Sequence, residues 1–374
     1  MHCSSFDRGL CRSCTLMGVG YSDQVHKKEA QVHAALTPWT ETVWLPTATS
    51  PEHGYRNKAK MIVGGTATHP TLGILDEFGV GIDLSDCGIC APELRDAFPA
   101  LSAFIRRVRL TPYNVAKRRG DLKYVIVTVS PDRELMVRFV VRSRESIEVI
   151  RRALPTLKSA LPSARVISVN IHPEHKAVVE GDEEVILTAN KHLVMRLAGL
   201  ELRLRPQSFF QTNTPVAAAL YEQVRGWSHQ LNPKRIWDLY CGVGGFALAT
   251  VSDSRVVTGV ETSPEAVRSA RASAAAAGAR TATFSSGDAT EFALASHKRP
   301  DLVIVNPPRR GIGEKLATWC DTSGVPHIVY SSCNPHSLRA DLGRLPHYRI
   351  REARLLDMFP QTAHCEVAVL LDRI

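Results

Sequence analysis

Several features are missing from this chain of 374 residues, and two of these absences exclude a class of protein. No run of 18 or more apolar residues occurs, so neither a transmembrane helix nor a membrane partner is expected. The N-terminal residues 1–14 lack the apolar segment of a signal peptide, which predicts a cytoplasmic protein. Internal repeats are absent, and the one biased tract is the alanine-rich run 270–279, which is typical of a helix.

The composition is that of a globular protein with room for two or three domains. Hydrophobic residues make up 44% of the chain and charged residues 22%, both ordinary values. The chain also contains nine cysteines. Disulfides are rare in the cytoplasm, so this number favours metal binding or catalysis.

Positive charge is concentrated in one part of the sequence. The net charge is +9, and residues 101–160 alone carry 14 Lys and Arg against five Asp and Glu. A concentrated basic surface favours a polyanionic partner, most often nucleic acid. The alternative is a basic face that is simply solvated.

Two regions differ in their hydrophobic pattern. Residues 120–205 are β-rich, and apolar or alternating segments occur there at 124–129, 135–141, 165–170 and 201–205. From about residue 206, strands alternate with helices; the predicted strands are 235–239, 256–261, 301–305 and 326–331. This alternation predicts an α/β domain with a parallel sheet covered on both faces. The last two strands, 348–357 and 366–372, have no helix between them and predict an antiparallel end.

Polar residues gather where the predicted strands of the second region end. Ligands bind outside the carboxyl ends of the strands in such sheets. The residues expected at this edge are Asp238 to Gly245, Glu261, Gly287 and Asp288, Asn306 to Gly311, and Cys333. A buried cysteine is more often packing than chemistry, but this position favours a functional thiol at Cys333.

A glycine turn and a carboxylate predict a nucleotide-like pocket. Gly242, Gly244 and Gly245 allow the backbone to approach a ligand closely, although Ala247 replaces the last glycine of the dinucleotide fingerprint. Glu261 ends the next strand, where a carboxylate can accept both ribose hydroxyls of an adenosine. Its alternative role is a favourable negative charge at the start of the following helix.

The segment Asn306-Pro307-Pro308 resembles the motif IV loop of S-adenosylmethionine-dependent methyltransferases. In amino-group methyltransferases an aromatic residue follows this motif and stacks on the target base. Here Arg309 follows, which weighs against methylation of an exocyclic amine. The alternative interpretation of this motif is an adenine-N6 or guanine-N2 RNA methyltransferase, which would give Cys333 no role.

Four features together resemble the RNA uracil-C5-methyltransferase family over nearly the whole chain. They are the segment 208–213, the turn 238–245, the loop 306–311, and Ser332-Cys333-Asn334-Pro335 with the late His364-Cys365-Glu366. The resemblance implies a Rossmann-like methyltransferase domain at 201–374 and a smaller β-rich, RNA-binding domain at 1–200. It also implies that part of 17–49 packs with the C-terminal domain. The residues implied to contact S-adenosylmethionine are Gln211, Tyr240, Glu261 and Asn306.

The chemistry of uracil explains why the family needs a thiol and a base. Uracil C5 is a poor nucleophile until a thiolate adds to C6, and a base must later remove the C5 proton. We expect Cys333 to be the nucleophile and Glu366 the base. Cys333 should then lie in an electropositive setting or near a helix N-terminus, which Asn334 and Pro335 predict.

Five further cysteines form a candidate metal site. Cys3, Cys11 and Cys14 are followed much later by Cys87 and Cys90, and four thiolates can hold zinc or an iron–sulfur cluster equally well by count. The family resemblance implies a [4Fe–4S] cluster held by Cys3, Cys11, Cys14 and Cys87. Whether Cys87 or Cys90 is the fourth ligand stays open.

The expected partner is RNA. The layout of the chain is similar to that of family members that methylate 23S ribosomal RNA, which implies this RNA, or an assembling large subunit, as the substrate of a monomeric enzyme. We expect phosphate contacts from Lys58, Lys60 and the basic segment 101–160. A third possibility is a catalytically idle ribosome-assembly factor that binds RNA through the same surface.

Overall fold

The computed structural model describes residues 1–176 and 178–374, which divide into two compact units. The N-terminal unit consists of Met1–Cys14, Glu52–Val194 and Arg205–Gln207. The C-terminal unit consists of Thr15–Pro51, Met195–Leu204 and Ser208–Ile374. Within the described ranges, no helix is long and apolar enough to cross a membrane.

The C-terminal unit contains an eight-stranded sheet in the order β1-β16-β17-β15-β14-β11-β12-β13. Its strands are β1 (Val43–Ala48), β11 (Arg235–Leu239), β12 (Val256–Glu261), β13 (Ala282–Ser286), β14 (Leu302–Val305), β15 (His327–Ser332), β16 (Tyr348–Leu356) and β17 (Glu366–Arg373). β11 to β15 are parallel, whereas β17 runs antiparallel to β15 and β16. The predicted α/β class and antiparallel end are therefore confirmed. The strand order reverses at β11, between β12 and β14, which is where such sheets bind ligands.

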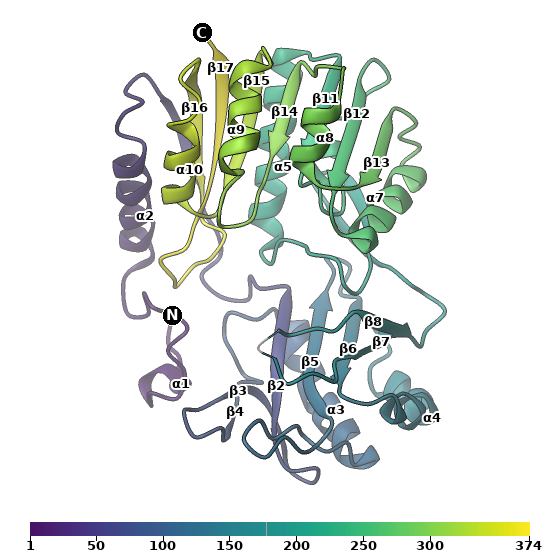
Figure 1. Ribbon diagram of the computed structural model, residues 1–374. Helices are drawn as coiled ribbons and strands as arrows, with labels where there is room; N and C mark the ends of the chain where they lie inside the picture. The colour runs from purple at the N-terminus through teal and green to yellow at the C-terminus, as the bar shows by residue number, and fades with distance from the viewer. Residues whose placement is uncertain (177) are drawn as a thin grey trace. The chain divides into compact units, whose positions relative to one another are not determined.

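Helices cover both faces of this sheet (Figure 1). They are α2 (Tyr21–Ala35), α5 (Thr214–Leu231), α6 (Gly245–Thr250), α7 (Pro264–Ala276), α8 (Ala289–Ala295), α9 (Gly313–Thr322) and α10 (Pro335–Leu342). In Figure 1, α8, α9 and α10 lie in front of the sheet and α5 lies behind it. Because both faces are covered, a strand such as β14 has four buried residues in succession, and its sequence is an unbroken apolar run. A hairpin of β9 (Leu193–Leu197) and β10 (Leu200–Leu204) forms a separate two-stranded sheet.

An early segment of the chain completes the C-terminal unit. β1 pairs in parallel with β16, with Val43 opposite Glu352, and α2 packs beside α10. Val32 and Leu36 from this segment belong to the same buried cluster as Tyr330 of β15. The sheet edge beyond β16 is thus formed by residues that precede the whole N-terminal sheet in the sequence.

The N-terminal unit contains a seven-stranded sheet in the order β4-β3-β2-β5-β6-β7-β8. Its elements are α1 (Ser4–Asp7), β2 (Lys58–Gly65), β3 (Pro70–Leu75), β4 (Gly81–Asp83), α3 (Pro92–Val108), β5 (Leu122–Val129), β6 (Leu135–Val141), α4 (Glu145–Ala160), β7 (Ala164–Ile171) and β8 (Glu183–Ile186). The sheet is antiparallel except for β6 and β7, which are joined by α4 and lie parallel. The β-rich character predicted for this region is confirmed, but its two long helices were not anticipated from the strand pattern.

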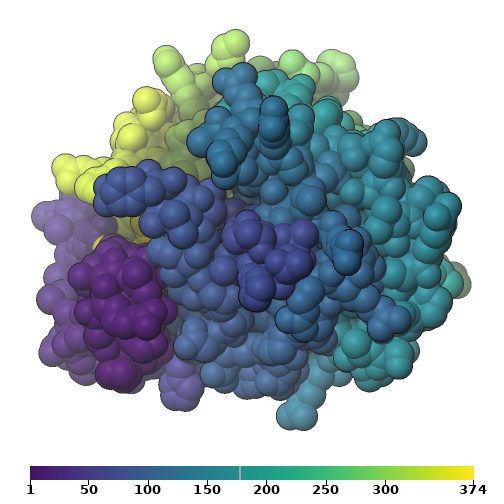
Figure 2. Space-filling view, turned by 90° about the horizontal axis from the view of Figure 1, so that it is seen from below, coloured from purple at the N-terminus to yellow at the C-terminus, as the bar shows by residue number. Residues whose placement is uncertain are grey.

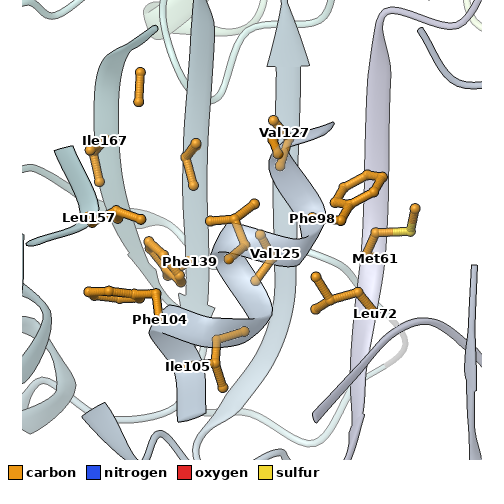
Figure 3. Packing of buried hydrophobic residues seen from close by; sticks show 14 of the residues in the cluster. Met61, Leu72, Phe98, Phe104, Ile105, Val125, Val127, Phe139, Leu157 and Ile167 are labelled. Carbon is orange, nitrogen blue, oxygen red and sulfur yellow. The ribbon is translucent and has the colours of Figure 1, made fainter. Parts of the chain in front are cut away.

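α3 and α4 cover one face of the N-terminal sheet. Figure 3 shows their side chains, including Phe98, Phe104 and Leu157, packed against Val125 and Phe139 of the strands. The alternation of strand residues follows from this arrangement, since Val125 and Val127 point to the helices and Tyr124 points to the opposite face. That opposite face carries polar and charged side chains together with buried apolar ones, Ile126, Met136 and Val140.

Candidate active site

The turn after β11 begins the site. Asp238 is fully buried, and one of its carboxylate oxygens, Oδ2, accepts a hydrogen bond of 2.8 Å from the Ala247 backbone, which fixes the turn to the start of α6. Tyr240 has a left-handed backbone (φ 69°), an uncommon conformation for a residue with a side chain. A Cβ on Gly242 would meet no atom within 4 Å, so the backbone here borders open space. A ligand that lies against the backbone of this turn requires such open space.

The second carboxylate oxygen of Asp238 has no partner. Among the described residues, nothing hydrogen-bonds to Oδ1, although it is buried. Burial, with a smaller contribution from Glu261, raises the pKa of Asp238 to about 7. A buried acceptor without a donor is costly, and a donor group or water brought by a bound ligand would satisfy it. The residues of the turn therefore fit a bound nucleoside-type ligand.

Glu261 faces the same turn from the end of β12. Its carboxylate accepts hydrogen bonds from the Gly242 backbone at 3.1 Å and from the Ser263 backbone at 2.9 Å. The contact with Ser263, which caps the next helix, α7, fits the helix-terminal role considered from the sequence, and the ribose-binding role stays a prediction. The Thr262 hydroxyl also donates to this carboxylate, at 3.0 Å. A carboxylate has about four acceptor positions, so about one remains for a ribose hydroxyl.

The loop after β14 is held against β15 and α10. Gly311 has φ +85°, and a Cβ there would collide with the Asp341 carboxylate. That buried carboxylate accepts hydrogen bonds from the Ile312 backbone at 2.8 Å and from the Tyr330 hydroxyl at 2.7 Å. Only glycine fits this close approach, so the loop that begins at Asn306 leaves the sheet in a fixed conformation.

Cys333 lies at the carboxyl end of β15, immediately before the start of α10. Asn334 caps this helix, accepting from the His336 backbone at 3.1 Å, and its side-chain amide donates to the Arg309 carbonyl at 3.0 Å. The Arg309 guanidinium, on the same loop, is near enough to Cys333 to lower the pKa of its thiol. The loop after β14 therefore places a cation beside the thiol.

The protonation of Cys333 reflects competing influences. Burial raises the pKa of the thiol, the Glu366 carboxyl raises it further, and the Arg309 guanidinium opposes both. The expected electropositive, helix-N-terminal setting is thus present in part, but the net direction is upward because burial and Glu366 outweigh the cation. The free protein holds Cys333 mainly as a thiol.

Glu366 begins β17 beside Cys333. It is buried, and its carboxylate accepts a hydrogen bond from the Ser331 hydroxyl on the adjacent strand β15. Burial raises the pKa of Glu366 to about 7, and the Ser331 bond only partly offsets this rise. A carboxyl group with this pKa can accept a proton near neutral pH, as a general base must.

The segment before Glu366 is fixed by α2. Asp357 pairs with the Lys28 ammonium at 2.5 Å, both groups being fully buried, and accepts from the Tyr21 hydroxyl at 2.8 Å. The Gln24 side chain donates a hydrogen bond to the Gln361 side chain at 3.1 Å and accepts one from the Gln361 backbone at 2.8 Å. These contacts, which no local sequence pattern indicates, fix the segment that precedes the candidate base, Glu366.

The loop that carries Gln211 contacts this same segment. Asn213 caps α5 and donates from its side chain to the Met358 carbonyl at 3.2 Å. Gln211 itself is nearly buried, whereas Phe209, two residues earlier, is 69% exposed. Sequence reasoning passed over Phe209, although an exposed aromatic side chain in a binding loop is a signal in its own right. Cys241, Cys320 and Cys365 are buried, as a packing role requires.

The expected cluster ligands lie in the N-terminal unit. In Figure 2 the first residues of the chain form a dark purple surface patch beside blue residues of this unit. A Cβ on Gly88 would lie 3.5 Å from the Met1 sulfur, so the N-terminal segment borders the turn that carries Cys87. Burial, together with proximity to Cys87, Cys11 and Cys3, raises the pKa of Cys14 to about 11.

In the part of the chain that the structure describes, however, no group of three or more His, Cys, Asp or Glu side chains is arranged to hold a metal ion. The [4Fe–4S] cluster thus stays a prediction. Cys90 is a member of the hydrophobic core, whereas Cys87 is only partly buried at its edge. Of the two, Cys87 is better placed to be a ligand.

Comparison with known proteins gives consistent matches. The family model described as tRNA (Uracil-5-)-methyltransferase matches residues 188–374. A protein of Halothiobacillus neapolitanus named 23S rRNA (uracil(747)-C(5))-methyltransferase RlmC is 48% identical, with 100% of both chains covered. A protein of Escherichia coli with the same name is 45% identical over 99% of both chains.

A solved structure also matches over most of the chain. The Pyrococcus abyssi tRNA (uracil-54, C5)-methyltransferase in complex with S-adenosyl-L-homocysteine superposes with a TM-score of 0.81 at 28% sequence identity. The match covers 96% of this chain and 85% of that one. The similarity therefore extends over the elements of both units.

Proposed function

This chain belongs to the tRNA (uracil-5-)-methyltransferase family, and from that premise we propose that it methylates C5 of a uridine in 23S ribosomal RNA. The methyl donor of this S-adenosylmethionine-dependent enzyme would be held by Gln211, Tyr240, Glu261 and Asn306. The names of the full-length relatives point to uridine 747 as the target. We further place the enzyme in the cytoplasm as a monomer, acting on free RNA or on an assembling large subunit.

The observation that carries the proposal is the grouping of Cys333, Arg309 and Glu366. A thiol beside a guanidinium stands next to a buried carboxyl group with a pKa of about 7, at the sheet edge that also carries Glu261 and the turn after β11. Methylation of an exocyclic amine needs neither the thiol nor this carboxyl group. An assembly factor without catalysis needs none of the three.

In the proposed reaction the Cys333 thiol first loses its proton to solvent, and the thiolate then adds to C6 of uracil, forming a C–S bond and giving C5 enolate character. C5 then attacks the methyl group of S-adenosylmethionine, and S-adenosylhomocysteine leaves. The Glu366 carboxylate removes the C5 proton, the C6–S bond breaks, and the thiolate is released with the C5–C6 double bond restored. Arg309 stabilises the thiolate at the first and last steps, because a cation beside sulfur favours its charged form.

Nucleoside mass spectrometry tests this function. Anaerobically purified protein is incubated with methyl-labelled S-adenosylmethionine and unmodified 23S ribosomal RNA, and the digested RNA is analysed for labelled nucleosides. We expect label in 5-methyluridine. Label in N6-methyladenosine or N2-methylguanosine would instead support the amino-group alternative, and binding without label would support the assembly factor.

We also propose that Cys3, Cys11, Cys14 and Cys87 hold a [4Fe–4S] cluster, with zinc as the alternative. The contact of the N-terminal segment with the turn at Gly88 supports the proposal, because it gathers ligands distant in sequence. The cluster would fix residues 1–14 to this turn. Iron and sulfide analysis of anaerobic protein tests it: we expect Cys87→Ser to lose iron and Cys90→Ser to keep it. Stoichiometric zinc in place of iron would identify the other metal.

A further inference from the structure

We propose that a pocket on the N-terminal sheet, on the face opposite α3 and α4, binds a nucleobase of the RNA substrate other than the target uracil. This inference rests on the proposed function, which makes the substrate an RNA. The cavity has a volume of about 240 Å³. It is lined by Ile62, Leu75, Tyr113, Val115, Lys123, Tyr124, His175 and Lys176. Pockets for drug-sized molecules start at about 300 Å³, so the size suits one ring system.

The aromatic part of the pocket is held rigidly. The Tyr113 hydroxyl and the Nδ1 atom of His175 are 2.8 Å apart, and the two rings meet at 62° with centroids 6.1 Å apart. Tyr113 is buried, whereas Tyr124 and Ile62, which are paired across β5 and β2, are only partly buried. A planar base can therefore lie against Tyr124 without rearrangement of Tyr113. Stacking of this kind is how proteins hold unpaired RNA bases.

A buried cation faces the same space. The Lys123 side chain is 5% exposed, and its ammonium lies 5.1 Å from the centre of the Tyr113 ring. It donates one hydrogen bond to the Glu174 carbonyl, and an ammonium has three protons to donate. The remaining protons suit a carbonyl or ring-nitrogen acceptor on a base edge. A purely apolar ligand would leave this charge without a partner.

Positive charge also surrounds the pocket. Arg142 lies 5.0 Å from the centre of the Tyr113 ring and donates to the carbonyls of Arg118 at 3.1 Å and Gly120 at 3.2 Å. These bonds fix the exposed basic run from Lys117 to Arg119. Phosphates on either side of a bound base would meet this run. An RNA strand explains the cations, whereas an apolar protein partner would not.

An exposed aromatic residue lies on the hairpin that supplies Leu75. In the β3–β4 turn, the Asp76 carboxylate accepts from the backbones of Phe78 at 2.9 Å and Val80 at 2.7 Å. The turn is thus fixed while the Phe78 side chain is 81% exposed. Large exposed aromatics mark binding surfaces. A neighbouring base of the bound RNA is suited to stack on the Phe78 ring.

The test compares two substitutions that are alike except in position. Val115→Glu places a negative charge on the pocket wall, and Val149→Glu places the same charge on α4, on the other side of the sheet. Both valines are exposed, by 47% and 41%, so neither change removes buried packing. The measurements are the Kd for an RNA fragment containing the target uridine and its flanks, at constant salt, and steady-state 5-methyluridine formation.

We expect Val115→Glu to raise Kd and KM about tenfold, equivalent to about 1.4 kcal/mol, with kcat unchanged. Val149→Glu should leave both constants within twofold of the wild type. Tyr124→Ala should resemble Val115→Glu, and Tyr124→Phe should restore binding because stacking needs the ring and not the hydroxyl. Equal losses in Val115→Glu and Val149→Glu would show a general charge effect and overturn the pocket.

The outcome separates this inference from the proposed function. If the wild-type protein forms 5-methyluridine and the pocket variants bind RNA as tightly as it does, the base-binding proposal is wrong and the proposed methylation stands. If the wild type forms no 5-methyluridine but Val115→Glu and Tyr124→Ala lose RNA binding selectively, the proposed methylation is wrong and the base-binding proposal stands.

Discussion

The two sheets of this protein place their chemistry in different positions. In the C-terminal sheet helices cover both faces, and the candidate catalytic groups lie at the carboxyl edge of the strands. In the N-terminal sheet α3 and α4 cover one face, and the other carries Tyr124, Lys123 and the buried Arg138 with its carboxylate partners Glu180 and Glu184.

The comparison shows how covering a sheet determines what it can bind. A sheet covered twice can offer a ligand only its edge, where backbone turns and strand ends fix a few groups with short hydrogen bonds. The middle strands of the N-terminal sheet are also buried on both faces, with all seven residues of β6 buried, so this sheet offers a ligand only partly buried positions such as Tyr124 and Ile62. We therefore assign chemistry to the C-terminal edge and RNA positioning to the pocket beside Tyr124.

The largest effect should come from removing the thiol at the C-terminal edge. Cys333→Ala should lower 5-methyluridine formation by roughly 10⁴-fold or more, because no other group can add to C6. RNA binding, assigned to the other sheet, should change by less than threefold. Cys320→Ala removes an equally sized thiol from the core and serves as the control. Retained activity in Cys333→Ala would remove the covalent mechanism.

Glu366→Gln should block turnover at a later step and retain the first. The thiolate can still add to uracil, but the C5 proton stays, so we expect a covalent protein–RNA adduct on denaturing gels. In the wild type, kcat should rise with pH up to about 7, the pKa of Glu366, since only the carboxylate accepts a proton. Absence of any adduct would argue against Glu366 as the base.

The same residue should affect stability with a defined sign. The folded-state pKa of Glu366 is raised from 4.5 to about 7, so folding favours the protonated form and stability falls as pH rises through that interval. Glu366→Gln removes this dependence. At pH 8 the variant should therefore unfold with a free energy higher by on the order of 3 kcal/mol, and at pH 4 the two proteins should be alike. Urea unfolding at both pH values measures the difference.

Lys28→Met should test whether α2 supports the C-terminal edge. The change leaves the Asp357 carboxylate buried without its cation, which typically costs about 3–5 kcal/mol. We also expect slower methylation at a temperature where the protein remains folded, because the segment before Glu366 loses an anchor. The double variant Lys28→Met/Asp357→Leu should recover most of the stability. Full activity in a destabilised Lys28→Met protein would make α2 a structural support alone.

Arg309→Gln should give the smallest of these effects. Without the guanidinium the pKa of Cys333 rises further, so methylation at pH 7 should fall by about 10- to 100-fold and recover in part as pH increases. Lys315→Gln, an exposed cation on α9, controls for a general loss of positive charge. A loss that is independent of pH would assign Arg309 to substrate binding instead.

The inner parallel strands of the C-terminal sheet, β11, β14 and β15, were predictable because they are buried on both faces. Leu302–Val305 is an apolar run followed by turn residues, and its bounds lie within a residue of the expected ones. The bounds of Val256–Glu261 are those expected, although this strand is less buried. The family resemblance implied that part of 17–49 packs with the C-terminal domain, but the pairing of β1 was not predictable, because six residues beginning at Val43 carry no sign of a partner beyond residue 348. Only the tertiary structure supplies that pairing.

The candidate site likewise contains residues that the sequence predicted and contacts that it could not predict. Motifs identified Cys333, Glu261 and Asn306, since each follows directly from a strand end. The proximity of Arg309 to the thiol and the ion pair of Lys28 with Asp357 join separate parts of the chain, and no spacing rule encodes them. Lys58, expected to contact phosphate, is instead buried near Arg138, and burial lowers its pKa to about 8.

The pairing of β1 with β16 has a consequence for biosynthesis. At about 5–20 residues per second, β1 leaves the ribosome tens of seconds before the strand it needs, which is encoded roughly 300 residues later. Through that interval it is an unpaired edge that another nascent chain can capture. Pro46 in the middle of β1 lacks an N–H group and so makes the waiting strand a poor template. The same residue accepts a hydrogen bond of 3.0 Å from Arg354 through its carbonyl once β16 arrives.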